Sequence, residues 1–304
     1  MALSQQELTQ SINDALAQLT DDIKNQRLDI PSPPSLLVKL RAVTSDSNIV
    51  QRSARRNLID IVDVVKLDPN ISGRLLKVSN STLFGARVHT TSVQGAVTRL
   101  GAKTVQNLVT SLLITQNFMQ AKTKGLESHC NNAWQHSNEV AAIAYSLARK
   151  KTSLDPEQAL LAGMTHNIGV LPIILRLSTI PSFKDKPELL SHVADIVIPK
   201  LYLGAGKLIL DSWNFPPEFS KVSLTHQSFN SHSEEEVNLQ EIIAIAYQLH
   251  KINDFSDNES EATTNEALVS SSLFNKLWSD WSEACSEINE LLPEMSNLKQ
   301  EMAQ

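Results

Sequence analysis

The chain has 304 residues, of which 41% are hydrophobic and 20% charged, a composition typical of folded domains and not of a disordered chain. At roughly 150 residues per domain, this length predicts about two domains. The 27 Lys and Arg residues against 33 Asp and Glu residues give a net charge of −6, which disfavours nucleic-acid binding because phosphate neutralisation needs a basic surface. The two cysteines form no CxxC pair, and no apolar run follows a basic leader or reaches membrane-spanning length. We therefore expect a soluble, cytoplasmic protein that binds neither membrane nor nucleic acid.

Apolar residues recur at helical spacing almost throughout, which predicts an all-α fold. A polar amphipathic helix is expected over 5–27, followed by a proline-rich break. The β-branched segment 57–66 also fits a strand, but we favour a helix. Asp68 and Pro69 predict a helix start, because Asp accepts from free N–H groups and Pro suits the first helical position. That helix is expected to end near Asn80.

Turn and cap residues divide the rest of the chain. Phe84-Gly85 predicts a turn, Ser92 a helix start and Gly101 its end, with a long helix over 102–120. The later helices are expected at 131–151, 156–177 with a kink near Gly169 and Pro172, 187–200, 203–213, 216–228 and 236–252. The acidic, Ser/Thr-rich stretch 253–265 predicts a surface loop. A terminal helix is expected to carry Leu273, Leu277, Trp278 and Trp281.

These elements predict two packed helical subdomains. The expected divisions are an N-terminal helix at 1–29, an N-terminal helical subdomain at 30–125, a second helical subdomain at 126–252, and an acidic loop with C-terminal helices at 253–304.

Three of the eight histidines lie in contexts that suggest a site, because imidazole is a common metal ligand. His136 stands near the start of a helix, His166 lies inside an apolar helix, and His226 ends a helix. A lone histidine on an apolar helix face is usually a satisfied core group. A solvated role is expected for the remaining five, which are His89, His129, His192, His232 and His250.

The order of several short motifs resembles the HDOD family, the HD-related output domains of bacterial signalling proteins, over residues 25–250. The motifs are Ile30-Pro31-Ser32-Pro33-Pro34, Leu67-Asp68-Pro69, Leu75 to Ser81, Phe84-Gly85, Ser92 to Gly101, Trp134-Gln135-His136-Ser137, Ala162 to Gly169 and Trp213-Asn214-Phe215-Pro216. The resemblance implies that the second subdomain is HD-domain-like.

The HDOD family is similar to the HD phosphohydrolases, in which His, a His-Asp pair and a later Asp hold metal ions that activate water. By this resemblance, His136 and His166 stand at ligand positions, whereas Asn167 replaces the Asp of the pair. Further pocket positions carry Tyr202, His226, Gln227 and Tyr247. His136, His166 and His226 remain weak candidates for a single metal ion, but they cannot offset the charge of two.

The resemblance implies a non-catalytic regulatory module that acts through contacts with signalling proteins, with no cofactor and a degenerate metal site. We expect His166 and Asn167 to hydrogen-bond to neighbouring helices or trapped water. Two alternatives remain: a metal-dependent phosphohydrolase acting on a nucleotide or cyclic dinucleotide, and a sensor that binds a small ligand in the remnant pocket.

Overall fold

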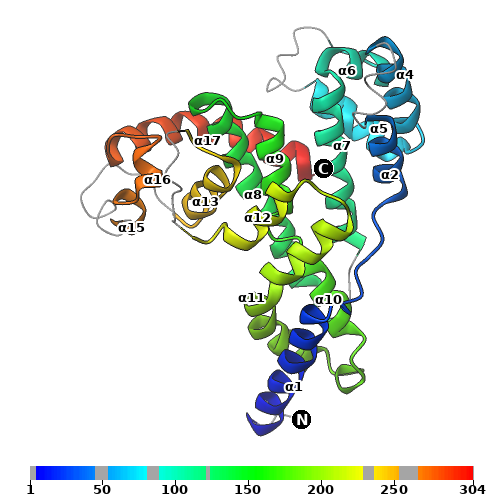
Figure 1. The fold of residues 1–304 in the computed structure, drawn as a ribbon, viewed down its shortest axis with the longest axis vertical. Coiled ribbons are helices and arrows are strands. Elements are labelled where there is room, and N and C mark those ends of the chain that lie inside the picture. Colours follow the sequence, from blue (N-terminus) through cyan, green and yellow to red (C-terminus); the bar gives the residue numbers. More distant parts are fainter. Residues whose placement is uncertain are drawn as a thin grey trace.

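The computed structural model describes residues 5–44, 54–80, 89–120, 124–228, 236–252 and 266–303. These residues form helices and no strand, so the predicted all-α fold class is confirmed (Figure 1). The predicted turn at Phe84-Gly85 and the predicted loop at 253–265 lie outside the described residues.

The first half of the chain forms a group of helices at the upper right of Figure 1. Its members are α2 (Ser35–Thr44), α4 (Ala54–Val65), α5 (Pro69–Ser79), α6 (Val93–Leu100) and α7 (Ala102–Gln120). The segment that also fitted a strand is helix α4, as we favoured. We call this set the N-terminal group.

Cap residues set the ends of these helices as expected. The carboxylate of Asp68 accepts two backbone N–H groups of the first turn of α5, at 2.9 and 3.1 Å. The hydroxyl of Ser92 accepts the N–H of Gly95 at 3.0 Å at the start of α6. Gly101 then ends α6 with a φ of 82°, a conformation that favours glycine. Local sequence therefore defines these boundaries.

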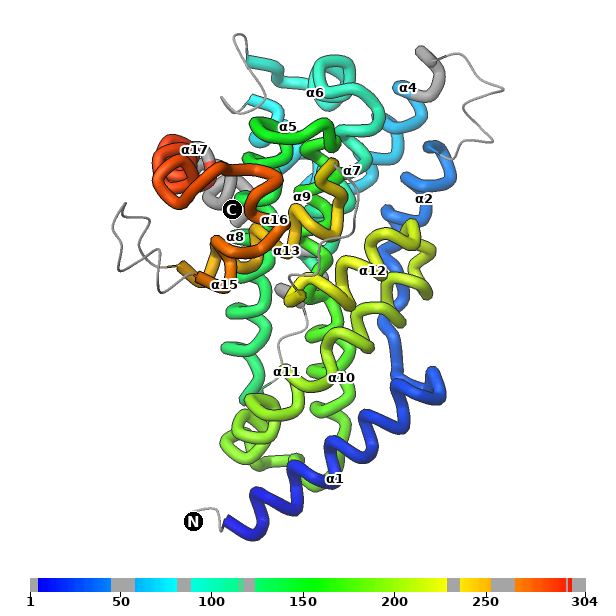
Figure 2. The backbone as a smooth tube through the Cα atoms, turned by 60° about the vertical axis from the view of Figure 1, so that its left-hand side comes forward, coloured from blue at the N-terminus to red at the C-terminus, as the bar shows by residue number. Residues whose placement is uncertain are grey.

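The second half of the chain packs around the long helix α8, and we call it the C-terminal group. Its members are α8 (Glu127–Lys151), α9 (Pro156–Thr165), α10 (Val170–Ser178), a short 3₁₀ turn (Pro181–Phe183), α11 (Pro187–Ser212), α12 (Pro217–Thr225) and α13 (Leu239–His250). Helix α1 (Gln5–Lys24) lies against α10 and α11 (Figures 1 and 2).

Two helix boundaries differ from those predicted. The segments 187–200 and 203–213 form one continuous helix, α11, with Pro199 inside it. The hydrogen bond lost at this proline is outweighed by packing, because buried side chains flank it on both sides. Conversely, 156–177 does not bend at Pro172, which lies in the first turn of α10 where a missing N–H costs nothing. The chain leaves the helix at 166–169, so the kink expected near Gly169 is confirmed and the one near Pro172 is wrong.

The C-terminal segment forms α15 (Glu266–Val269), α16 (Ser272–Asn275) and α17 (Trp281–Ala303). The single terminal helix predicted here is wrong, because Leu273 lies in α16 and Leu277 and Trp278 in the segment that follows it. Trp281 opens α17. The indole side chains are buried, so these residues fill the core from short elements instead of one helix face.

Helix α17 joins the two groups. It lies along α8, where Lys151 is 2.7 Å from Glu287 and Lys150 is 2.8 Å from Glu290, and it also contacts α5 (Figure 2). Leu75 of α5 is fully buried. Helix α5 therefore packs inside the N-terminal group and also reaches the C-terminal segment.

One helical stretch, Pro156–Ser178, is long and apolar enough to cross a membrane by length and composition. Within the fold, 89% of its most apolar window is buried. Such burial is typical of a core segment.

Candidate functional site

A cavity of about 340 Å³ opens where α8, α11 and α13 meet the junction between α9 and α10. Five of the seven predicted site residues line it: His136, Asn167, Tyr202, Gln227 and Tyr247. The other two, His166 and His226, are fully buried and contact the rings of the lining residues. The structure thus brings together all seven positions, although they come from three helices, α8, α11 and α13, and from the segments that follow α9 and α12.

Four imidazole rings form the centre of this site. The ring centroid of His136 lies 4.9 Å from that of His166 and 4.5 Å from that of His250. The ring centroids of His166 and His226 are 4.7 Å apart. Those of Tyr247 and His226 are 5.0 Å apart, in an edge-to-face arrangement. These tilted, edge-to-face arrangements are typical of packed aromatic groups. We call His136, His166, His226 and His250 the imidazole cluster.

Backbone carbonyls fix the orientation of the two buried imidazoles. Nδ1 of His166 is 2.6 Å from the carbonyl oxygen of Gly163, and Nδ1 of His226 is 3.0 Å from that of Val222. In both neutral rings Nδ1 therefore carries the proton. Nε2 of His226 can then accept from the hydroxyl of Tyr202 at 2.9 Å, whereas Nε2 of His166 is buried with no hydrogen-bond partner among the described residues.

Asn167 is held on both sides of its amide by helix α8. Its Nδ2 donates to the carbonyl oxygen of Ala133 at 3.1 Å, and the hydroxyl of Ser137 donates to its Oδ1. The expectation of bonds to a neighbouring helix is therefore confirmed for Asn167. Nδ1 of His166 bonds instead to a carbonyl oxygen of its own helix, and the expected water partner of His166 stays a prediction.

Gln227 closes the other side of the cavity. Its Nε2 donates to the hydroxyl of Tyr202 and lies 3.4 Å from the hydroxyl of Tyr247. Burial, and then the neighbouring Tyr247, raise the pKa of Tyr202 above its ordinary value. The phenol of Tyr202 therefore stays neutral at physiological pH, and both phenols serve as hydrogen-bonding groups.

Three histidines of the cluster, His136, His166 and His226, are neutral at pH 7. Burial, followed by the proximity of His250, His226 and Lys251, lowers the pKa of His136 to about 3. Burial lowers the pKa of His226 to about 4, and burial with the two neighbouring imidazoles lowers the pKa of His166 well below 6.5.

These shifts predict acid sensitivity. The folded-state pKa values lie below the unfolded value of about 6.5, so the unfolded chain binds protons first as the pH falls. Stability is complete above pH 6.5 and is lost progressively towards pH 4, by about 2 kcal/mol per histidine at pH 5. Urea denaturation at pH 7, 6 and 5 measures this loss. The exposed His192 supplies the control: His192→Gln should leave the pH dependence unchanged, whereas His136→Gln should reduce it. Equal stability at pH 7 and pH 5 would contradict the prediction.

Two histidines that were expected to be solvated take part in packing. His250 lies against His136, and its Nδ1 is 3.1 Å from a carboxylate oxygen of Glu139. His129 lines the cavity and its Nε2 is 2.8 Å from Asp195. The solvated role is therefore wrong for both. His250 could have been found, because it follows the last predicted site tyrosine by three residues and so shares its helix face.

The donors around the cavity do not fit a two-metal centre. Such a centre needs carboxylates that offset the charge and bridge the ions, and Asn167, Gln227 and the tyrosines supply none. Across the described ranges, no three His, Cys, Asp or Glu side chains are arranged to hold a metal ion. That this chain carries no metal stays a prediction.

Comparison of the sequence with known protein families agrees with the motif order and with the histidine-lined helical cavity. The sequence profile of the HDOD domain matches residues 30–229 of the chain. The chain belongs to the HDOD family. This match confirms the resemblance seen in the sequence. His136, His166 and His226 lie within the matched residues, whereas His250 lies beyond them.

Solved structures share this fold. A Shewanella amazonensis SB2B protein, provisionally named a metal-dependent phosphohydrolase, superposes with a TM-score of 0.71 at 22% identity, covering 96% of this chain and 99% of its own. An HDOD domain protein of unknown function from Geobacter sulfurreducens superposes with a TM-score of 0.65 at 16% identity, with the same coverage of both chains. A Marinobacter aquaeolei VT8 protein, provisionally named a signal transduction protein, gives 0.58 at 18% identity, covering 97% of this chain and 66% of its own.

One relative by sequence is an uncharacterized protein of Treponema pallidum (strain Nichols). It is 24% identical over 231 residues, which cover 72% of this chain and 41% of the relative. The chain therefore spans less than half the length of that protein.

Proposed function

We propose that this HDOD protein is a non-catalytic regulatory module of signal transduction, acting in the cytoplasm through contacts with other proteins. The observation that carries the proposal is Asn167. A neutral amide, hydrogen-bonded at both ends to α8, occupies the position where HD phosphohydrolases place a metal-binding carboxylate. Without that charge, water activation by paired metal ions has no support in the site.

The cavity itself favours a second candidate, a small-ligand sensor. Its volume of about 340 Å³ lies within the range of small-molecule sites, and it presents two imidazoles, two phenols and three amides. This alternative keeps the protein non-catalytic.

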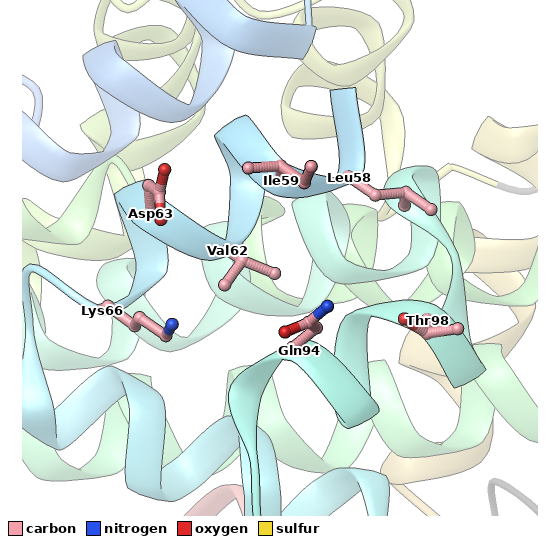
Figure 3. A pocket seen from close by; sticks show the side chains of 7 residues that line it. All are labelled: Leu58, Ile59, Val62, Asp63, Lys66, Gln94 and Thr98. Atoms are coloured by element: carbon pink, nitrogen blue, oxygen red, sulfur yellow. The ribbon is translucent and has the colours of Figure 1, made fainter. Parts of the chain in front are cut away.

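A groove on the N-terminal group supports the part of the proposal that concerns protein contacts. It encloses about 440 Å³ between α4 and α6, with Leu58, Ile59 and Val62 as its apolar wall (Figure 3). The side chains of Asp63 and Lys66 lie beside that wall, and Ile59 is 48% exposed. A partner that presents an apolar side chain between a basic and an acidic group would complement this surface.

Turnover assays test the catalytic side of the proposal. Purified protein should hydrolyse neither nucleotides nor cyclic dinucleotides above background in magnesium, manganese, iron or zinc. Turnover that disappears in a His166→Ala variant would show that the site is catalytic after all.

Paired surface variants test the contact side. A partner captured by the tagged wild-type chain in its native host should be lost with Ile59→Asp. It should be kept with Ile196→Asp, which alters an exposed isoleucine on α11, outside the N-terminal group. Identical capture by both variants would rule out the α4–α6 groove as the contact surface.

A further inference from the structure

A second groove, of about 520 Å³, lies between the N-terminal and C-terminal groups. It shares no lining residue with the cavity of the imidazole cluster. One wall comes from α2 and α7, and the other from α9, α12 and the segment 214–216. Its volume suits a small molecule, and its lining combines side-chain amides, a guanidinium group and phenylalanine rings.

Two cations line this groove: Lys103, which is paired with Asp155 at 2.7 Å, and Arg41. One of the terminal nitrogens of Arg41 donates to the carbonyl oxygen of Trp213, and its guanidinium carbon lies 4.3 Å from the ring centroid of Phe215. The carbonyl and the ring hold the guanidinium in place but leave most of its N–H groups without an acceptor in the described part of the chain.

The partial burial of this uncompensated charge is unusual. Burial lowers the pKa of Arg41, and no carboxylate among the described residues forms an ion pair with it. Buried charges in proteins are normally paired, because desolvation of an isolated ion is costly. An anion in the groove would supply the missing partner.

Side-chain amides surround Arg41. Gln106 and Asn107 reach the groove from α7, and Asn214 reaches it from the opposite wall. None of these three amides makes a hydrogen bond to another described residue. Asn214 also holds a φ of 53°, a left-handed conformation that residues other than glycine rarely adopt. A hydrogen-bonding ligand would satisfy all three.

We propose that this groove binds a small organic anion. Its phosphate or carboxylate group pairs with the guanidinium of Arg41, and its polar body hydrogen-bonds to Gln106, Asn107 and Asn214. Because the walls come from both helix groups, the bound anion fixes their relative position. This proposal is independent of the regulatory function proposed above. If the groove binds no anion, that function is unaffected.

Calorimetric titration at constant ionic strength tests the proposal with two matched pairs of probes. AMP against adenosine tests a phosphate group, and N-acetylaspartate against N-acetylasparaginamide, in which both carboxylates are amides, tests a carboxylate. The charged member of at least one pair should bind with a dissociation constant below about 1 mM and at least about tenfold more tightly than its neutral partner. Equal or undetectable binding of both members in both pairs overturns the proposal.

Variants locate the binding. Arg41→Gln should weaken the charged probe by about tenfold or more. Arg41 also anchors the segment at Trp213, so a second variant is needed. Asn214→Gly keeps the backbone conformation, because the φ at this position suits glycine. It should weaken binding of the charged probe several-fold. Asn132→Ala, at the mouth of the other cavity, should bind as wild type does. Wild-type affinity in both groove variants overturns the assignment.

Discussion

Replacing Gly169 by alanine is expected to cost about 3 kcal/mol or more of unfolding free energy. A Cβ atom at this position would overlap the carbonyl oxygen of Tyr202 and the backbone nitrogen of Gly206, both in helix α11. Backbone atoms cannot rotate away as a side chain can, so α10 and α11 must separate. The shift would also move the hydroxyl of Tyr202 away from Nε2 of His226. The side chains of the imidazole cluster should therefore be packed less closely in the variant.

Gly73 provides the matched control, because a Cβ there would meet no atom within 4 Å. It lies in the interior of α5, so Gly73→Ala should stabilise the protein by about 0.5–1 kcal/mol. Urea denaturation of both variants measures the difference. Similar stability changes in the two would show that α10 and α11 do not approach as closely as described.

Replacing Asn167 by aspartate is expected to destabilise the metal-free protein by about 3 kcal/mol. The new carboxylate would lose the donor bond to Ala133 and bring a charged oxygen towards that carbonyl, while only the hydroxyl of Ser137 could compensate. The position is 5% exposed, so water offers little relief. Excess zinc or manganese should restore part of the loss, through chelation with His136 and His166.

Asn132→Asp is the control for this change. Asn132 lies on the exposed face of α8, so the same substitution should change stability by no more than about 0.5 kcal/mol. Denaturation with and without metal compares the pair. If Asn167→Asp is as stable as wild type without metal, the amide does not have the structural role assigned to it.

Local signals predicted most of the helices, because caps and apolar spacing act over a few residues. Asp68, Ser92 and Gly101 set boundaries in this way. The continuity of α11 through Pro199 could not be predicted, since it depends on burial against other helices that local sequence does not record. The break at 166–169 was indicated by Gly169 and not by periodicity, because the apolar pattern runs on across it.

The candidate site was predicted through family resemblance, and its chemistry through the identity of Asn167. Spacing alone could not have shown that His136, His166 and His226 converge, because they lie on separate helices. His250 was not predicted as a site residue, because its contact with His136 depends on the packing of α13 on α8. The groove at Arg41 was missed for the same reason, since its walls come from segments far apart in the chain.

Metal analysis of the purified wild-type protein tests most directly whether the imidazole cluster is a metal centre. Two divalent ions are needed for the phosphohydrolase mechanism, so the expected result is fewer than about one bound ion per chain. Adding zinc or manganese should then leave the unfolding free energy unchanged, with or without a chelator. Two bound ions per chain, together with a stabilisation of about 3 kcal/mol or more that a chelator removes, would contradict a non-catalytic site.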